Sequence, residues 1–364
     1  MSLPEIEEMA GQMIMAGVHK NQPDKKLVEM VKKGWLGGVI LFPSKSDPLE
    51  LRRSTDYLQS LSPQNPLFIA IDQEGGRVAR LGEPFTQFPA MHWLGRTGSA
   101  QIAFEVGKVL GAELRAVGIN VNFAPVLDLA INPNSKVIGD RSLGSEPDLV
   151  AELGAEIIKG IQSEGVLACA KHFPGHGATE KDSHFELPKI EINKDLLKSR
   201  EIVPFKKAID EGVKMVMVGH LLFPCLDPYH PASLSERVVG DFLKQELGFK
   251  GLVISDALEM KALDILPFID RVYLCAKAGV DIILTAEGGE RAQVIHNVLV
   301  QAVKTGALRL ERIYESYLRI TQLKKEWLEK FKPPPKRLIS KIVGSKEHKE
   351  ISQRIKVFCN TNQS

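Results

Sequence analysis

The sequence has little of what marks secreted, membrane-bound or nucleic-acid-binding proteins. Its four cysteines are scattered among 364 residues without a Cys-x-x-Cys pair, and Cys169 and Cys275 lie in apolar runs where small buried side chains are expected. Basic residues outnumber acidic ones by only two, 47 against 45, which gives no indication of a nucleic-acid or anionic membrane partner. The N-terminal stretch MSLPEIEEMAGQ is acidic where a signal peptide is basic, and no apolar run is long enough to span a bilayer. We therefore expect a cytoplasmic protein without membrane insertion.

Short apolar segments alternate with amphipathic, helix-like ones along most of the chain. The apolar segments are apolar almost continuously, which is typical of strands buried on both faces. Several of the helix-like segments end in glycine just before the next strand, as a helix C-terminus does. This alternation predicts an α/β fold, a closed parallel (β/α)8 TIM-type barrel. The expected strands lie in 12–18, 36–42, 66–72, 119–128, 165–173, 214–221, 251–258 and 279–285, and the expected helices in 24–34, 100–118, 148–165, 195–212, 290–306 and 308–331.

The second fold considered is a doubly wound open sheet. It is disfavoured because no Gly-x-Gly-x-x-Gly follows the first strand. After the helix at 308–331, the stretch PPPKRLISKIVGSKEHKE interrupts the pattern with three prolines and lysine-rich sequence. We expect a single barrel domain over 1–331 and a short C-terminal extension over 332–364 that forms no second domain.

Polar residues gather where the expected strands end. Asp72, Asp128, His172, His220 and Asp256 each stand at or near the C-terminal end of a strand. Any one of them has an ordinary explanation, because every strand meets polar residues as it reaches the surface. Barrel enzymes build their active sites at this end, so five acidic or imidazole groups there favour a catalytic site.

The stretch KHFPGHGATEKDSHFELP, residues 171–188, has a composition that neither a helix nor a strand favours, so we expect a loop. His172, His176 and His184, with Asp182, are one candidate set of metal ligands, but Pro174 and Gly175 stand between the first two histidines and disfavour the helical spacing that such a site uses. Asp182 and His184 suit an acid–base pair instead, because a carboxylate near an imidazole fixes its tautomer and raises its basicity. Asp and Ser are also ordinary turn residues, so a plain turn remains the simpler interpretation of these residues alone.

In the stretch VISDALEM, Asp256 ends an apolar strand, where a rigidly held carboxylate can act as a nucleophile. Ser255 and Asp256 are equally suited to cap a following helix.

Five stretches together resemble the family 3 glycoside hydrolases of the β-N-acetylhexosaminidase type. They are IDQEGGRVARL with FTQFPAM, NFAPVLDL with GDRSLG, KHFPGHGATEKDSHFELP, MVMVGHL and VISDALEM, in the family's order over roughly residues 5 to 330. The resemblance implies that Asp256 is the nucleophile and that His184 is the acid/base, with Asp182 as its partner. It also implies that five residues bind the terminal sugar: Asp72, Arg80, Arg141, Lys171 and His172. Four further residues match the family at supporting positions: Asp128, His220, Glu74 and Met260. For His176 we expect a bracing role in the loop.

The activity implied is that of a retaining exo-β-N-acetylglucosaminidase. Its expected substrate is a GlcNAc-containing saccharide or muropeptide, by resemblance N-acetylglucosaminyl-1,6-anhydromuramyl peptides of cell-wall recycling. We expect a monomer without metal or cofactor. The alternatives are a β-glucosidase, xylosidase or GlcNAc phosphorylase of the same family, a metal-dependent amidohydrolase-like barrel, and a sugar-binding protein without catalysis.

Overall fold

The computed structural model describes residues 4–132, 134–179 and 187–361. Eight strands form one sheet in the order β10-β1-β2-β3-β6-β7-β8-β9, and all neighbours pair in parallel. A parallel bridge between Ile254 and Ile282 joins the two ends of this order, so the sheet closes on itself. The prediction of a parallel (β/α)8 barrel is confirmed. The strands are β1 (Ile14–His19), β2 (Gly38–Phe42), β3 (Phe68–Ile71), β6 (Val121–Asn122), β7 (Leu167–Phe173), β8 (Met215–Val218), β9 (Leu252–Ser255) and β10 (Ile283–Thr285).

Seven of the eight strands lie within the predicted apolar segments, and β1 extends one residue beyond its segment, to the exposed His19. The strands are buried along almost their whole length. Strand β6 is much shorter than the predicted segment 119–128, because Pro125 has no N–H to donate to a ladder. The side chains of Asn120 and Asn122 replace part of the ladder there, accepting the N–H groups of Ile69 at 2.7 Å and Gln73 at 3.1 Å. Burial on both faces explains why the strands read as continuous apolar runs.

Side chains also close the joint between β9 and β10. The Asp281 carboxylate accepts the N–H of Val253 at 3.0 Å, and the Ser255 hydroxyl accepts the N–H of Leu284 at 3.0 Å. Nearer the C-terminal ends of the strands, the carboxylate of Glu259 accepts the N–H of Ala286 at 2.5 Å. Three side chains therefore supply ladder partners along the joint that carries the end of β9.

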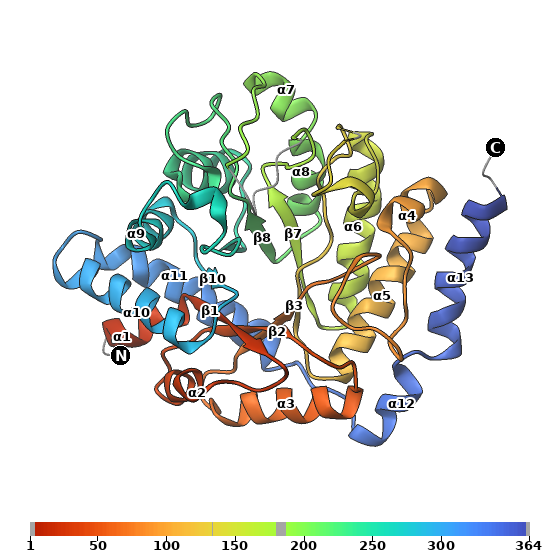
Figure 1. Ribbon diagram of the computed structural model, residues 1–364, viewed down its shortest axis with the longest axis horizontal. Helices are drawn as coiled ribbons and strands as arrows, with labels where there is room; N and C mark the ends of the chain where they lie inside the picture. The colour runs from red at the N-terminus through yellow and green to blue at the C-terminus, as the bar shows by residue number, and fades with distance from the viewer. Residues whose placement is uncertain (1–3, 133, 180–186, 362–364) are drawn as a thin grey trace.

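Helices surround the barrel (Figure 1). The predicted helix 195–212 is two helices, because Pro204 cannot continue a helix through the carbonyl of Arg200. No helix in the described part of the chain is both long and apolar enough to cross a membrane. The main helices are α1 (Ile6–Gln12), α2 (Lys25–Lys32), α3 (Pro48–Ser60), α4 (Met91–Thr97), α5 (Ala100–Ala116), α6 (Pro147–Ser163), α7 (Lys194–Ser199), α8 (Ile202–Asp210), α9 (Phe268–Ala278), α10 (Gly289–Lys304) and α11 (Leu310–Leu323), with a π-helix at Arg237–Glu246.

The C-terminal segment folds back onto the barrel. It forms α12 (Ile339–Ile342) and α13 (Lys346–Thr361), which Figure 1 shows beside α5 and α4. Three side chains of α13 are buried against these helices, those of Ser352, Ile355 and Cys359. The segment is therefore packed on the barrel rather than extended away from it.

Candidate active site

A cavity of about 530 Å³ opens over the C-terminal ends of the strands. Its deep part is charged, since the side chains of Lys171 and Glu74 line it and are 3% and 1% exposed. Its rim carries exposed basic side chains, among them Arg77, Arg80 and Lys136. All predicted site residues that the structure describes line this cavity: Asp72, Arg80, Arg141, Lys171, His172 and Asp256.

The floor of the cavity is a connected group of two carboxylates and two cations. Lys171 donates from Nζ to Oδ1 of Asp72 at 2.9 Å and to Oε1 of Glu74 at 2.5 Å. Arg141 binds the same Glu74 carboxylate with two parallel hydrogen bonds, of 2.8 Å from Nε and 2.7 Å from the terminal nitrogen. Such bidentate pairs fix both partners in orientation as well as position. The positions of the two cations are thus fixed by the protein itself.

Charge pairing controls the ionisation of this group. Burial raises the pKa of Glu74, but the charges of Lys171 and Arg141 outweigh it and lower that pKa to about 2. Burial lowers the pKa of Lys171, but the carboxylates of Asp72 and Glu74 outweigh it and hold that pKa above its ordinary value. Glu74, Lys171 and Arg141 are therefore charged at neutral pH, and they present fixed donors and acceptors to a polar ligand.

Arg80 stands at the rim, at the end of a short hairpin formed by β4 (Gln73–Gly75) and β5 (Val78–Ala79). Its terminal nitrogen lies 3.6 Å from Oδ2 of Asp72, and its guanidinium lies over the ring of Phe42, 5.4 Å from the ring centre. Its side chain is 45% exposed. Arg80 is the most accessible of the predicted sugar-binding residues.

His172 and His176 are organised around the fully buried Asp128. His172 donates from Nδ1 to the Asp128 carboxylate at 2.7 Å, and that carboxylate also accepts the backbone N–H of His176 at 2.7 Å. Burial raises the pKa of Asp128, but the two histidines outweigh it and hold the pKa below the usual range. The bond at Nδ1 leaves the other ring nitrogen of a neutral His172 as an acceptor.

Burial lowers the pKa of His176 to about 4, so its imidazole is neutral at pH 7. The rings of His172 and His176 lie edge to face, with centres 6.1 Å apart. In the described part of the chain, no three His, Cys, Asp or Glu side chains are grouped as a metal site requires.

Asp256 follows β9, and its position is set from two sides. Its backbone N–H donates to the carbonyl of Val218 at 3.0 Å, and its Oδ1 accepts the N–H of Ala257 at 2.8 Å. His220, which is fully buried, contacts the Ala257 carbonyl through Nε2 at 2.9 Å and the Ser233 hydroxyl through Nδ1 at 2.7 Å. Since a carbonyl only accepts, Nε2 carries the proton.

The capping alternative for Ser255 and Asp256 does not describe this turn. No α-helix begins at Asp256, and the hydroxyl of Ser255 is engaged by strand β10 instead. The local structure presents Asp256 at the cavity wall, on a turn that is held by the neighbouring strands.

Two of the predicted site residues, Asp182 and His184, lie outside the described residues. The segment around them is bounded by described residues on both sides. On the N-terminal side, the backbone of Gly177 accepts the N–H of Asn132 at 3.1 Å. On the C-terminal side, Lys189 bridges in parallel to Leu222, in the loop that follows β8.

Sequence analysis assigned Glu74 a supporting position and did not single out Glu259. Glu74 proves to be the centre of the cavity floor, and its signal in the sequence is its place two residues after Asp72. Glu259 lines the cavity three residues after Asp256, and burial raises the pKa of its carboxyl. It lies within the quoted stretch VISDALEM, where nothing local distinguishes it from a surface glutamate.

The fold and the cavity together define a (β/α)8 barrel with a charged, sugar-sized site at the C-terminal ends of its strands, the arrangement of a barrel enzyme. Residues 5–323 match the model of the glycosyl hydrolase family 3 N-terminal domain, and the chain belongs to this family.

Curated relatives include proteins named β-hexosaminidase. One from Nitrosomonas eutropha is 43% identical over 235 residues, which are 62% of this chain and 66% of the relative. One from Methylobacillus flagellatus is 34% identical over 310 residues, 83% of this chain and 88% of the relative. A β-hexosaminidase A from Pseudoalteromonas piscicida is 36% identical, and the match spans 55% of that relative's length.

Solved structures of the family are similar over nearly the whole chain. A family 3 β-N-acetylglucosaminidase from Paenibacillus sp. str. FPU-7 has a TM-score of 0.89 and 36% identity, covering 97% of this chain and 68% of that one. A β-N-acetylhexosaminidase from Beutenbergia cavernae has a TM-score of 0.82 and 25% identity, covering 88% of this chain and 99% of that one.

Proposed function

We propose that this protein is a retaining exo-β-N-acetylglucosaminidase that removes terminal β-linked GlcNAc. The observation that carries the proposal is the floor of the cavity, where Asp72, Glu74, Lys171 and Arg141 form one hydrogen-bonded group. Fixed carboxylates bind sugar hydroxyls in pairs, and fixed cations donate to hydroxyl and acetamido oxygens. Family membership and relatives named β-hexosaminidase support the same choice of sugar.

In the proposed reaction, the Asp256 carboxylate attacks the anomeric carbon and the glycosidic C–O bond breaks. His184 gives its proton to the leaving oxygen, with Asp182 stabilising the imidazolium. Water then loses a proton to His184 and attacks the same carbon, which releases GlcNAc and frees Asp256. Two inversions give net retention. The donor is an imidazole here, where most retaining enzymes use a second carboxyl.

The finer part of the proposal concerns the substrate and setting. We propose that the leaving group is a 1,6-anhydromuramyl peptide and that the enzyme acts as a monomer in cytoplasmic cell-wall recycling. The exposed Lys136 at the rim supports an anionic leaving group, whereas Arg77 beside it is paired with Asp140 at 2.7 Å. Hydrolysis of purified anhydromuropeptides, compared with that of chitobiose, tests this preference. A kcat/KM that is no higher for the muropeptide would contradict it.

Trapping of the covalent intermediate tests the reaction itself. A 2-acetamido-2-deoxy-5-fluoro glycosyl fluoride should label a single peptide within residues 251–260, and Asp256→Asn should abolish the label. Label elsewhere would overturn the assignment of the nucleophile. Aryl β-GlcNAc should be hydrolysed in preference to aryl β-glucoside, and the reverse preference would favour a β-glucosidase.

The proton donor has its own test. Asp182→Ala should slow aryl glycosides with poor leaving groups far more than those with good ones, because only a poor leaving group needs the proton. An equal loss for both would contradict the role of Asp182 with His184.

A further inference from the structure

The C-terminal helices contact the segment that follows Arg80. Gly344, between α12 and α13, approaches so closely that an added Cβ would lie 2.0 Å from the carbonyl oxygen of Pro84. From α13, Ser352 donates to the carbonyl of Gln87 at 2.7 Å. Both contacted residues belong to segment 81–90, which connects the hairpin of the cavity wall to α4.

A buried carboxylate on α5 ties the same two parts together. Glu113 accepts the N–H and the hydroxyl of Thr86 at 2.9 and 2.7 Å. It also accepts the N–H of Gly344 at 2.8 Å and Nδ1–H of His348 at 2.9 Å. Glu113 is 4% exposed, so these are four charge-assisted hydrogen bonds in a site that is shielded from water.

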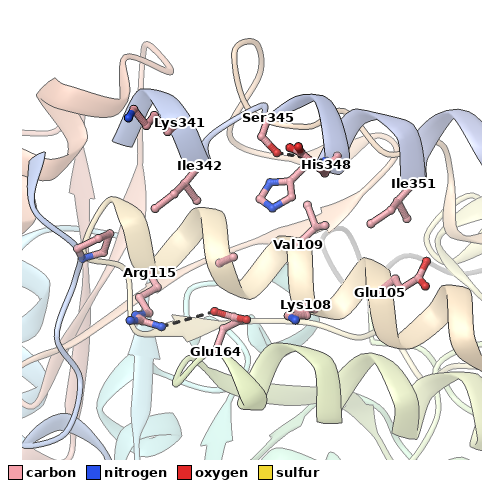
Figure 2. Close-up of a pocket in the computed structure, with 13 residues that line it drawn as sticks. Glu105, Lys108, Val109, Arg115, Glu164, Lys341, Ile342, Ser345, His348 and Ile351 are labelled. Atoms are coloured by element: carbon pink, nitrogen blue, oxygen red, sulfur yellow. Dashed lines mark hydrogen bonds and ion pairs between the residues drawn. The ribbon is translucent and has the colours of Figure 1, made fainter. Parts of the chain in front are cut away.

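Part of the interface with α5 is open. A cavity of about 580 Å³ separates α12 and α13 from α5, and Figure 2 shows the side chains of Ile342, His348 and Ile351 directed across it. On its outer side, an ion pair of 2.6 Å joins Arg354 of α13 to Glu105 of α5. Ile339, Val343 and Ile355 of the C-terminal segment are buried in the core, so apolar packing holds these helices on the barrel. The polar contacts with Glu113 and segment 81–90 add direction to that packing.

Segment 81–90 in turn holds the hairpin that carries the sugar-binding side chains. Gln87 donates to the carbonyl of Leu81 at 3.2 Å, and Leu81 exchanges two hydrogen bonds with the side chain of Gln73. The carbonyl of Phe88 accepts the N–H of Gly76 at 3.1 Å. Glu74 and Arg80 belong to this hairpin or directly follow it, so a continuous set of contacts runs from α13 to the cavity.

We propose that helices α12 and α13 are part of the catalytic unit, and that His348 and Ser352 are positioning residues that fix Arg80 and Glu74 for the terminal sugar through Glu113 and segment 81–90. The inference rests on the proposed function, because it takes Arg80 and Glu74 to hold the sugar. Loss of a fixed sugar contact that is equal in the ground and transition states raises KM and leaves kcat unchanged.

The test uses the full chain with His348→Ala and Ser352→Ala combined, assayed on an aryl β-GlcNAc. We expect KM to rise about three- to tenfold, the range of a coupling through packed contacts, with kcat within about twofold of wild type. Arg354→Ala is the matched control, since it removes a contact of α13 with α5 alone; it should leave KM unchanged even if it lowers the melting temperature. His348→Asn keeps a donor at the position of Nδ1 and should keep the wild-type KM.

An unchanged KM in the double variant, or an equal rise in KM for Arg354→Ala, would overturn the proposal. Hydrogen exchange of the amides in 82–90 gives a readout that does not depend on activity: protection should fall in the double variant and not in Arg354→Ala. If the wild type does not hydrolyse aryl β-GlcNAc, the proposed function fails. In that case, unaltered hydrogen exchange of the amides in 82–90 in the double variant would still overturn the proposed coupling of α13 to segment 81–90. Faster exchange of these amides would support the coupling.

Discussion

Replacing Glu74 by Gln is the sharpest test of how the cavity floor is held together. The substitution keeps the shape of the side chain and removes one negative charge. It leaves Lys171 and Arg141, 3% and 10% exposed, short of one of their partners. Removing one partner of a buried ion pair is more damaging than removing both, because an uncompensated charge stays behind.

The pKa of Glu74 gives the size of the effect. Its fall from 4.5 to about 2 on folding corresponds to about 3 kcal/mol of stability at pH 7. Because the folded-state pKa is the lower one, this contribution is complete above pH 4.5 and is lost as the pH falls towards about 2. At about pH 3 roughly half of it remains.

Urea unfolding of both proteins between pH 7 and pH 3.5 measures this difference. Glu74→Gln should be less stable by about 3 kcal/mol at pH 7, and the difference should shrink as the pH falls. Glu29→Gln, which removes an exposed carboxylate paired with Lys26 and Lys33 on α2, is the control and should change little at any pH. A deficit of Glu74→Gln that is the same at pH 7 and pH 3.5 would refute the electrostatic account and indicate a packing defect.

Three further substitutions test other parts of the structure. Burial raises the pKa of Glu259, so ionisation of this carboxyl lowers the stability of the fold above that pKa. Glu259→Gln should therefore raise the melting temperature at pH 8 and not at pH 4. An equal rise at both pH values would contradict this explanation. Asp281→Asn removes a fully buried carboxylate with three cationic neighbours at the far end of the barrel. The substitution should lower the free energy of unfolding, measured in urea, by about 3–5 kcal/mol and leave kcat/KM of the folded protein unchanged. A change in kcat/KM without a loss of stability would contradict the distance of Asp281 from the cavity. In Gly177→Ala the new Cβ would lie 1.5 Å from the carbonyl oxygen of Leu129, so activity should fall. Gly240→Ala is the control, because its Cβ meets no atom closer than 3.6 Å and activity should be unchanged. Similar activities of the two variants would contradict the close approach at Gly177.

The strands were predictable from the sequence because their environment is uniform. Both faces are buried, so an apolar run such as 36–42 needs no knowledge of its neighbours. The C-terminal helix α13 was not predicted, although Ile351, Ile355 and Cys359 recur at four-residue spacing on one face. The lysine-rich, proline-led stretch before it obscured that pattern. Its packing surface was beyond prediction, since Glu113 lies more than two hundred residues away.

Which residues line the site was largely predictable from the sequence, but the hydrogen bonds and ion pairs between them were not. Strand ends placed Asp72, His172 and Asp256 at one rim because parallel strands end together. The pairing of Glu74 with Arg141 spans 67 residues and depends on how a long loop returns to the cavity, which no local pattern encodes. The family resemblance identified Arg141 as a site residue, but it did not indicate that Glu74 is the partner of Arg141.

The joint between β9 and β10 has a consequence for how this enzyme tolerates mutation. A backbone ladder survives nearly every substitution, since all residues except proline carry the same N–H and carbonyl groups. Along this joint the N–H groups of Val253, Leu284 and Ala286 donate to side chains, beside backbone bonds such as that from Ser255 N–H to the carbonyl of Ile282 at 3.0 Å. Part of the hydrogen bonding therefore depends on which residues stand at 255, 259 and 281. A library that varies the cavity rim can therefore include positions such as Lys136, while these three positions should keep residues with a hydrogen-bond acceptor.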